Sequence, residues 1–205
     1  MLRSYEKKDS ELNICIYIYD QAEVLDFSGP FEVFSTAARI CEGKDPFNVF
    51  LVSELSEKTN ARGGYKVLSD YDFSNHPPID VLIVVGGVHT KEMEKSNVIE
   101  WISQQASKAS IVASVCTGAF LLAQAGVLTT QEVTTHWEDV ADLRRLFPKL
   151  KVVEGVRWVD QGKLVTSGGI SAGIDMSLHL VSMLQDENLA EKTAKQMEFS
   201  WTKNS

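Results

Sequence analysis

Short runs of β-branched and apolar residues alternate along this chain with stretches in which apolar residues recur at helical spacing. The runs that predict buried strands are residues 13–19, 47–53, 79–85 and 110–115. The stretches that predict helices are residues 25–40, 96–108, 117–126 and 137–147, with a long apolar-striped helix from about Ser171. Residues 156–167 predict a hairpin, and the polar residues 54–75 predict a short hairpin or a crossing strand.

Continuous apolar strands separated by helices are typical of a parallel sheet that is buried on both faces. The pattern therefore predicts an α/β fold: a doubly wound, mostly parallel sheet with helices on both faces. No linker, repeat or low-complexity segment divides the 205 residues, so we expect residues 12–205 to form a single domain. Residues 1–11 are polar, and we expect them to form a flexible N-terminal segment.

The composition is that of an ordinary globular protein, and it argues against several kinds of partner. Asp and Glu number 28 against 20 Lys and Arg, a formal charge of −8 that predicts no binding to nucleic acid or to an anionic membrane. The apolar runs are shorter than the ~20 residues that span a bilayer, and the N-terminus lacks the apolar core of a secretory signal. Three cysteines without paired spacing lead us to expect a cytoplasmic protein.

The segment SVCTGAF places Cys116 at the junction of a predicted strand and a predicted helix. A thiol at such a sharp turn has the geometry of a nucleophile elbow, in which Gly118 lets strand and helix approach closely. The N-terminus of a helix favours an anion, so we expect it to lower the pKa of the thiol. The alternative is a small buried hydrophobic residue, the interpretation that fits Cys15 and Cys41.

Two glycines, Gly86 and Gly87, directly follow the predicted strand at residues 79–85. Their backbone N–H groups, with that of Thr117, are candidates for an oxyanion hole at the same edge of the sheet. A tight turn that requires glycine is the alternative explanation of the pair. The segment matches neither GxGxxG nor a Walker loop, so the sequence does not support nucleotide binding.

Several polar side chains could lie beside this thiol. Asp26 stands at the start of the predicted helix 25–40, where it is either an N-cap or a carboxyl group next to the site. Glu32 on the same helix, His89 after the glycine pair and His136 in the segment TTHW are candidates for lining the site. No His, Cys, Asp or Glu residues have the spacing of a zinc site, so we expect no metal.

Five segments, taken together and in order, resemble the ThiJ/PfpI superfamily, and most closely its isonitrile hydratase branch. They are LDFSGPFEVF (25–34), VVGG (84–87), SVCTGAFLLAQAGVL (114–128), TTHW (134–137) and LVTSGGISAGIDMSLHLV (164–181). The resemblance covers nearly the whole chain after residue 12. It implies the flavodoxin-like fold of class I glutamine amidotransferases for the single domain.

The resemblance also implies roles for individual residues. Cys116 matches the nucleophile, Asp26 the acidic residue that hydrogen-bonds to it, and Thr117 the residue that follows the nucleophile. The implied enzyme is a lyase that converts an isonitrile and water to an N-substituted formamide through a Cys116 thioimidate. The resemblance further implies a homodimer that acts on a small-molecule substrate without a cofactor. Four Trp and nine Phe are consistent with an interface, where aromatic residues are enriched.

Three other functions stay open at this point. Glyoxalase or deglycase chemistry on 2-oxoaldehydes would use the same thiolate. A redox sensor would instead be oxidised at Cys116 to the sulfenic or sulfinic acid. The last is a binding domain related to transcriptional regulators, which in this superfamily carry a helix-turn-helix domain after this one; we do not expect that domain in a chain ending at Ser205.

Overall fold

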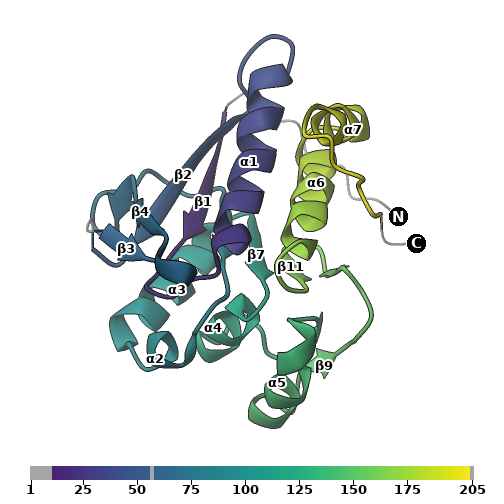
Figure 1. Ribbon diagram of the computed structural model, residues 1–205. Helices are drawn as coiled ribbons and strands as arrows, with labels where there is room; N and C mark the ends of the chain where they lie inside the picture. The colour runs from purple at the N-terminus through teal and green to yellow at the C-terminus, as the bar shows by residue number, and fades with distance from the viewer. Residues whose placement is uncertain (1–10, 56–57, 204–205) are drawn as a thin grey trace.

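The computed structural model describes residues 11–55 and 58–203 and folds them into a three-layer α/β domain (Figure 1). The predicted flexible segment, residues 1–11, lies outside the described residues except for Glu11. A seven-stranded sheet has the order β10-β11-β7-β6-β1-β2-β5. All neighbouring strands in it are parallel except β10 and β11, so the predicted fold class is confirmed.

The elements have the following bounds. The strands of the large sheet are β1 (Leu12–Tyr17), β2 (Phe47–Ser53), β5 (Tyr71–Asp72), β6 (Val81–Val84), β7 (Ile111–Val115), β10 (Trp158–Asp160) and β11 (Leu164–Ser167). Two small sheets pair β3 (Lys58–Asn60) with β4 (Lys66–Leu68), and β8 (Glu132–Val133) with β9 (Lys151–Val152). The helices are α1 (Val24–Ile40), α2 (Thr90–Met93), α3 (Ser96–Lys108), α4 (Gly118–Gln124), α5 (Val140–Leu146), α6 (Ala172–Leu184) and α7 (Glu187–Gln196), with 3₁₀ turns η1 (Arg62–Gly64) and η2 (Trp137–Asp139).

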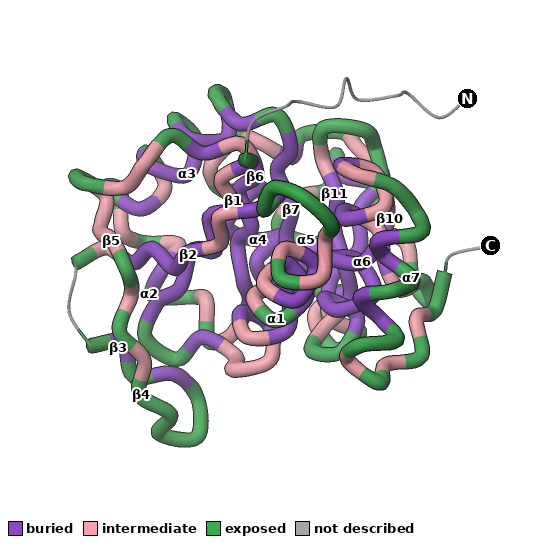
Figure 2. Tube along the Cα trace, turned by 90° about the horizontal axis from the view of Figure 1, so that it is seen from above, coloured by how far each residue is buried: buried purple, intermediate pink, exposed green. Residues whose placement is uncertain are grey.

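Helices cover both faces of the large sheet, as predicted. On one face α1, α6 and α7 contact one another, and on the other α2, α3 and α4 do so (Figure 1). The central strands between these layers are buried along their length, as Figure 2 shows for β6 and β7. A strand that is covered on both faces has no solvent side, which explains why the sequence shows continuous apolar runs instead of alternation.

The predicted elements agree with the structure most closely in the interior. The predictions for residues 47–53 and 96–108 match β2 and α3 at both ends, and residues 156–167 contain the antiparallel pair of β10 and β11. Within residues 58–72 the structure contains the predicted hairpin, formed by β3 and β4, and then the short strand β5 at the edge of the large sheet. Helix α7 was not predicted from the sequence, although Asp186 caps it by accepting a hydrogen bond from the Leu189 N–H at 2.9 Å.

Most large aromatic side chains are inside the domain. Trp101 and Trp158 are buried, whereas Trp137 is 76% exposed. The core therefore accounts for much of the aromatic content but not for Trp137, and the predicted homodimer stays a prediction. None of the helices among the described residues combines the length and apolar character that crossing a bilayer requires.

The parallel strands end together, and this edge positions the site. Tyr17, Val84, Ser114 and Thr166 share one register across β1, β6, β7 and β11. The loops that follow these four strands therefore meet at the carboxyl edge, where ligands bind in open α/β sheets.

Gly118 at the start of α4 lies directly against β6, which gives a test of this arrangement. A Cβ on Gly118 would lie 2.0 Å from the Val84 carbonyl oxygen, so α4 would have to move away from the sheet. A glycine-to-alanine change inside a helix ordinarily stabilises by about 1 kcal/mol. For Gly118→Ala we instead expect the free energy of unfolding to fall by about 3 kcal/mol, measured by urea denaturation.

Gly29→Ala in α1 is the matched control. Its Cβ would lie 3.0 Å from Ile174 Cγ1, so it requires only a small shift of a side chain and no displacement of backbone, and we expect a smaller loss of stability. A Gly118→Ala protein as stable as the wild type would contradict the close approach of α4 and β6.

Candidate active site

Cys116 follows β7 directly and occupies the strained turn predicted for it. Its φ angle is +56°, a left-handed conformation that non-glycine residues rarely adopt. The Cys116 N–H donates to the carbonyls of Ser167 at 3.2 Å and Gly168 at 3.3 Å, and its carbonyl accepts from the Thr135 hydroxyl at 2.8 Å. The surrounding loops therefore hold the cysteine backbone in a conformation that it would not adopt alone.

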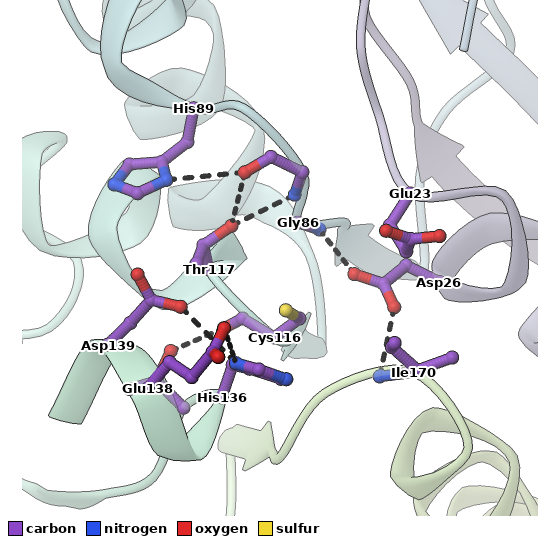
Figure 3. Close-up of polar contacts among 12 residues, drawn as sticks. Glu23, Asp26, Gly86, His89, Cys116, Thr117, His136, Glu138, Asp139 and Ile170 are labelled. Atoms are coloured by element: carbon purple, nitrogen blue, oxygen red, sulfur yellow. Dashed lines mark hydrogen bonds and ion pairs between the residues drawn. The ribbon is translucent and has the colours of Figure 1, made fainter. Parts of the chain in front are cut away.

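Asp26 lies beside this thiol, in the first turn of α1. Its Oδ2 accepts a hydrogen bond from the Gly86 N–H and its Oδ1 one from the Ile170 N–H, both at 3.1 Å (Figure 3). Asp26 also lies next to Cys116, because a Cβ on Gly86 would lie 2.7 Å from the Cys116 Cβ and 2.8 Å from Asp26 Oδ2, and each group acts on the pKa of the other. The N-cap of α1 is Glu23, so the interpretation of Asp26 as the helix cap is wrong.

The environment of Asp26 makes it an acid that titrates near neutral pH. Burial of its side chain raises the pKa to about 7, and the negative charge of Glu23 acts in the same direction. The N–H groups of Gly86 and Ile170 lower the pKa but do not overcome burial. A carboxyl group with such a pKa can donate and accept a proton in successive steps at neutral pH.

The pKa of the Cys116 thiol is raised, not lowered as the sequence led us to expect. Burial is the largest cause, and the Asp26 carboxylate adds to it, whereas the Thr117 N–H acts in the opposite direction. Cys116 is only 7% exposed and α4 has only seven residues, so desolvation outweighs the field of the helix end. A reactive thiolate therefore depends on a neighbouring group that accepts the proton.

The glycine pair positions the site, and its N–H groups already have acceptors. The Gly86 N–H is bound by Asp26 and the Gly87 N–H by Thr117 Oγ1 at 2.9 Å, while the Thr117 hydroxyl donates to the Gly87 carbonyl at 3.0 Å. This corrects the prediction that both glycines offer free N–H groups to an oxyanion. Of the predicted donors, the Thr117 N–H is the one that lowers the pKa of the Cys116 thiol. Gly86 is needed for space, because a Cβ would lie 2.7 Å from the Cys116 Cβ.

A cavity of about 260 Å³ opens onto Cys116. His89 and His136 line it, as predicted, but Glu32 does not: it is exposed on α1 and accepts a hydrogen bond from the Thr36 hydroxyl at 2.9 Å. Six residues along an α-helix rotate a side chain by about 240°, so Glu32 cannot share the face of Asp26.

The two histidines differ in their surroundings. His136 Nδ1 lies 3.5 Å from Asp139 Oδ2 and 3.9 Å from Glu138 Oε2. His89 Nδ1 lies 3.4 Å from the Gly87 carbonyl oxygen, and burial lowers the pKa of this histidine, which keeps it neutral at pH 7. His136 is the histidine next to the thiol, because a Cβ built on Gly169 would touch both its ring and the Cys116 sulfur.

Sequence reasoning missed several residues that shape the cavity. They are Glu23, Arg62, Glu138, Asp139 and Ile170. Ile170 has a φ of +57°, a strained value for a β-branched residue, at the point where its N–H binds Asp26. Gly168 and Gly169 indicate a turn before Ile170 in the sequence, whereas no local pattern predicts that Arg62 of η1 lies at the carboxyl edge. Among the described residues no three His, Cys, Asp or Glu side chains are arranged to hold a metal.

The raised pKa of Asp26 predicts how stability depends on pH. Between about pH 4 and pH 7 the folded protein keeps a proton that the unfolded chain releases, so this group lowers the free energy of unfolding as pH rises. A shift of about three units corresponds to about 4 kcal/mol across that range. Urea unfolding at pH 5 and pH 8 should show a flatter pH dependence for Asp26→Asn than for the wild type.

The pH dependence, and not the absolute stability, is the informative quantity. Asn places an NH₂ group opposite one of the two N–H donors that Asp26 binds, which costs stability at every pH. Equal pH dependence in the two proteins would show that Asp26 titrates at its ordinary pKa.

The reciprocal hydrogen bonds of Thr117 predict the effect of a nearly isosteric change. Thr117→Val removes the hydroxyl that serves both the N–H and the carbonyl of Gly87, so we expect a loss of about 1–3 kcal/mol in urea unfolding. Thr117→Ser keeps the hydroxyl and should restore most of that loss. If Ser and Val have the same effect, the hydroxyl does not tie α4 to the glycine turn.

The chain is similar to known proteins along most of its length. Residues 12–183 match the DJ-1/PfpI family. The chain is 32% identical to isonitrile hydratase of Pseudomonas putida over 190 residues, 92% of this chain and 79% of that protein. It is 26% identical over 169 residues to the HTH-type transcriptional regulator GbdR of Pseudomonas aeruginosa, a match that takes in 82% of this chain but only 46% of the regulator.

Solved structures show the same fold at lower identity. A ThiJ/PfpI family protein from Pseudomonas syringae matches with a TM-score of 0.83 and 22% identity, covering 96% of this chain and 78% of that one. Drosophila melanogaster DJ-1beta matches with a TM-score of 0.78 and 18% identity, covering 94% and 100%. On the evidence of the family match and of the 32% identity across most of both sequences, the chain belongs to the DJ-1/PfpI family.

Proposed function

We propose that this protein is an isonitrile hydratase-like lyase, which adds water to an isonitrile to form an N-substituted formamide. The observation that carries the proposal is the Cys116–Asp26 pair: a thiol that lines a small cavity and, next to it, a carboxyl group of pKa about 7. The 32% identity to isonitrile hydratase of Pseudomonas putida supports the same reaction. No cofactor enters the proposed chemistry.

The first step uses the proton that the pair shares. Transfer of the thiol proton to Asp26 produces a thiolate and a carboxylic acid without changing the net charge of the buried site, which reduces the cost of forming the thiolate there. The Cys116 sulfur then forms a bond to the terminal carbon of the isonitrile. Asp26 donates its proton to that carbon, leaving a thioimidate, R–N=CH–S–Cys116, and an Asp26 carboxylate.

The second step reverses the role of Asp26. The carboxylate accepts a proton from a water molecule as the water oxygen bonds to the thioimidate carbon, and Asp26 passes this proton to the nitrogen, which gives R–NH–CH(OH)–S–Cys116. As this tetrahedral intermediate expels the Cys116 thiolate, Asp26 accepts the proton of its hydroxyl group, and R–NH–CHO is released. Asp26 returns its proton to the sulfur, so one isonitrile and one water become one formamide and the enzyme is regenerated.

The structural surroundings of Cys116 weigh against the redox-sensor alternative. Sensor cysteines are typically accessible and have a low pKa, whereas Cys116 is 7% exposed and burial raises the pKa of its thiol. The partial match to GbdR supports a binding domain as the alternative to be separated by experiment, and 2-oxoaldehyde chemistry remains the alternative reaction.

Turnover of cyclohexyl isonitrile, followed as formamide by mass spectrometry, tests the proposal. We expect turnover by the wild type, a loss of at least about 1,000-fold in Cys116→Ala and of about 100-fold in Asp26→Asn. The control is Cys41→Ala, which removes a thiol at the C-terminal end of α1, away from the site. This variant should retain wild-type turnover within about twofold.

A parallel assay with methylglyoxal separates the alternatives. Cys116-dependent consumption of methylglyoxal without formamide formation would replace the hydratase by a glyoxalase. Binding of an isonitrile without turnover of either substrate would favour the binding domain. Equal turnover by wild type and Cys116→Ala would remove the proposed mechanism.

A further inference from the structure

The charges around the cavity are unequal, and this asymmetry is not used by the proposed mechanism. Three carboxylates line the cavity, those of Glu23, Glu138 and Asp139, against one guanidinium, that of Arg62. Arg62 Nη1 is already bound to Glu23 Oε2 at 3.0 Å, so these two charges offset each other. The carboxylates of Glu138 and Asp139 therefore remain as the excess charge of the described lining.

Glu138 and Asp139 stand on η2, at the side of the cavity that also carries His136. Their side chains are 65% and 30% exposed, so they lie at the mouth, whereas Cys116 lies below them. Figure 3 shows both carboxylates beside the His136 ring, on the side of Cys116 opposite Asp26. Even if His136 carries a positive charge, it faces two carboxylates, and the lining keeps a negative excess.

The field of Asp139 reaches the reacting groups. Its negative charge contributes to the raised pKa of Cys116, and it acts on His89 across the cavity in the direction that favours the protonated form. An anionic molecule that approaches the sulfur enters the same field. At the effective dielectric constant of a partly exposed site, each carboxylate several ångströms from the sulfur slows the reaction of a singly charged anion by about fivefold.

We propose that Glu138 and Asp139 are specificity-determining residues that admit neutral and cationic small molecules to Cys116 and disfavour molecules that carry a carboxylate. For catalysis this names the substrate class of the function proposed above and rests on it. The charge selection itself is a property of the cavity and can be measured on the thiol without any turnover.

Alkylation of Cys116 by matched reagents is the direct test. Iodoacetamide is neutral, iodoacetate carries one negative charge and 2-bromoethylamine is a cation at neutral pH. Peptide mass mapping gives the rates at Cys116 and at Cys41, which is half-buried at the end of α1 and serves as a reference in the same molecule. The ratio of two reagents at one thiol cancels its thiolate fraction, because both react with the same thiolate.

We expect the ratio of the iodoacetate rate to the iodoacetamide rate to be at least about tenfold lower at Cys116 than at Cys41. The ratio of the 2-bromoethylamine rate to the iodoacetamide rate should be higher at Cys116 than at Cys41. In Glu138→Gln/Asp139→Asn the Cys116 ratio should approach that of Cys41. Glu32→Gln removes a carboxylate of α1 that does not line the cavity and should leave the ratio unchanged. High salt should reduce the wild-type difference.

Two results would overturn the inference: ratios at Cys116 and Cys41 that agree within about twofold, or a Cys116 ratio that the double variant does not change. If the double variant does not fold, Glu138→Gln alone replaces it, since that side chain is largely exposed, and a shift of about fivefold is then expected.

Turnover of methyl isocyanoacetate and of isocyanoacetate separates this inference from the proposed function. A kcat/KM that is at least about tenfold lower for the acid, restored in the double variant, supports both. Absence of turnover with either isonitrile removes the proposed function but leaves the alkylation ratios as the measure of charge selection. Equal kcat/KM for the two compounds would overturn the charge selection while preserving the hydratase.

Discussion

A single buried carboxyl group holds the candidate site together. Asp26 comes from the helix that follows β1, and it binds the N–H of Gly86 after β6 and the N–H of Ile170 after β11. It is also coupled to Cys116 after β7. Loops from four strands of one sheet therefore converge on one side chain, and each contact fixes a residue whose backbone has little room to move. Loss of this carboxyl group would leave two N–H donors without their acceptor and would remove the neighbour of the thiol. Asp26 therefore both positions the loops of the site and sets the acid–base properties of the thiol.

The close approach of these loops depends on glycines, because a side chain at Gly86 would fill the space between them. A Cβ on Gly86 would lie 2.6 Å from the Thr117 backbone nitrogen and 2.8 Å from Asp26 Oδ2, so only glycine lets the β6 loop reach the elbow. The same close packing buries the thiol and the carboxyl group and raises the pKa of both. Desolvation favours the neutral form of both groups. The field at the N-terminus of the short helix α4 favours the thiolate, but it is the weaker effect. Burial is therefore the stronger influence on this thiol.

The sequence predicted those features that depend on local pattern. Continuous apolar runs predicted the covered parallel sheet, and the strand-to-helix junction predicted the position of Cys116 at a strained turn. The proximity of Asp26 followed from the resemblance, since its position at a helix start was equally compatible with a cap. The prediction that the pKa of the Cys116 thiol is lowered was wrong, because the burial that raises it is a property of the assembled fold and is not encoded in a local sequence pattern. Arg62 and Asp139 were missed for the same reason, since their loops reach the cavity only through tertiary packing.

Relatives of this chain include both an enzyme and regulators, so the fold by itself does not decide between catalysis and binding. The buried pair supplies an argument that the fold cannot. A carboxyl group whose pKa is raised from 3.8 to about 7 destabilises the folded protein by about 4 kcal/mol above neutral pH, a large part of the stability of a typical domain. An amide or an apolar side chain at this position would avoid the cost of ionisation above neutral pH, but it would leave at least one of the N–H groups of Gly86 and Ile170 without an acceptor. An acid of pKa near 7 next to a thiol is suited to moving a proton to and from a reacting atom at neutral pH, and this is the use that the proposed function assigns to it.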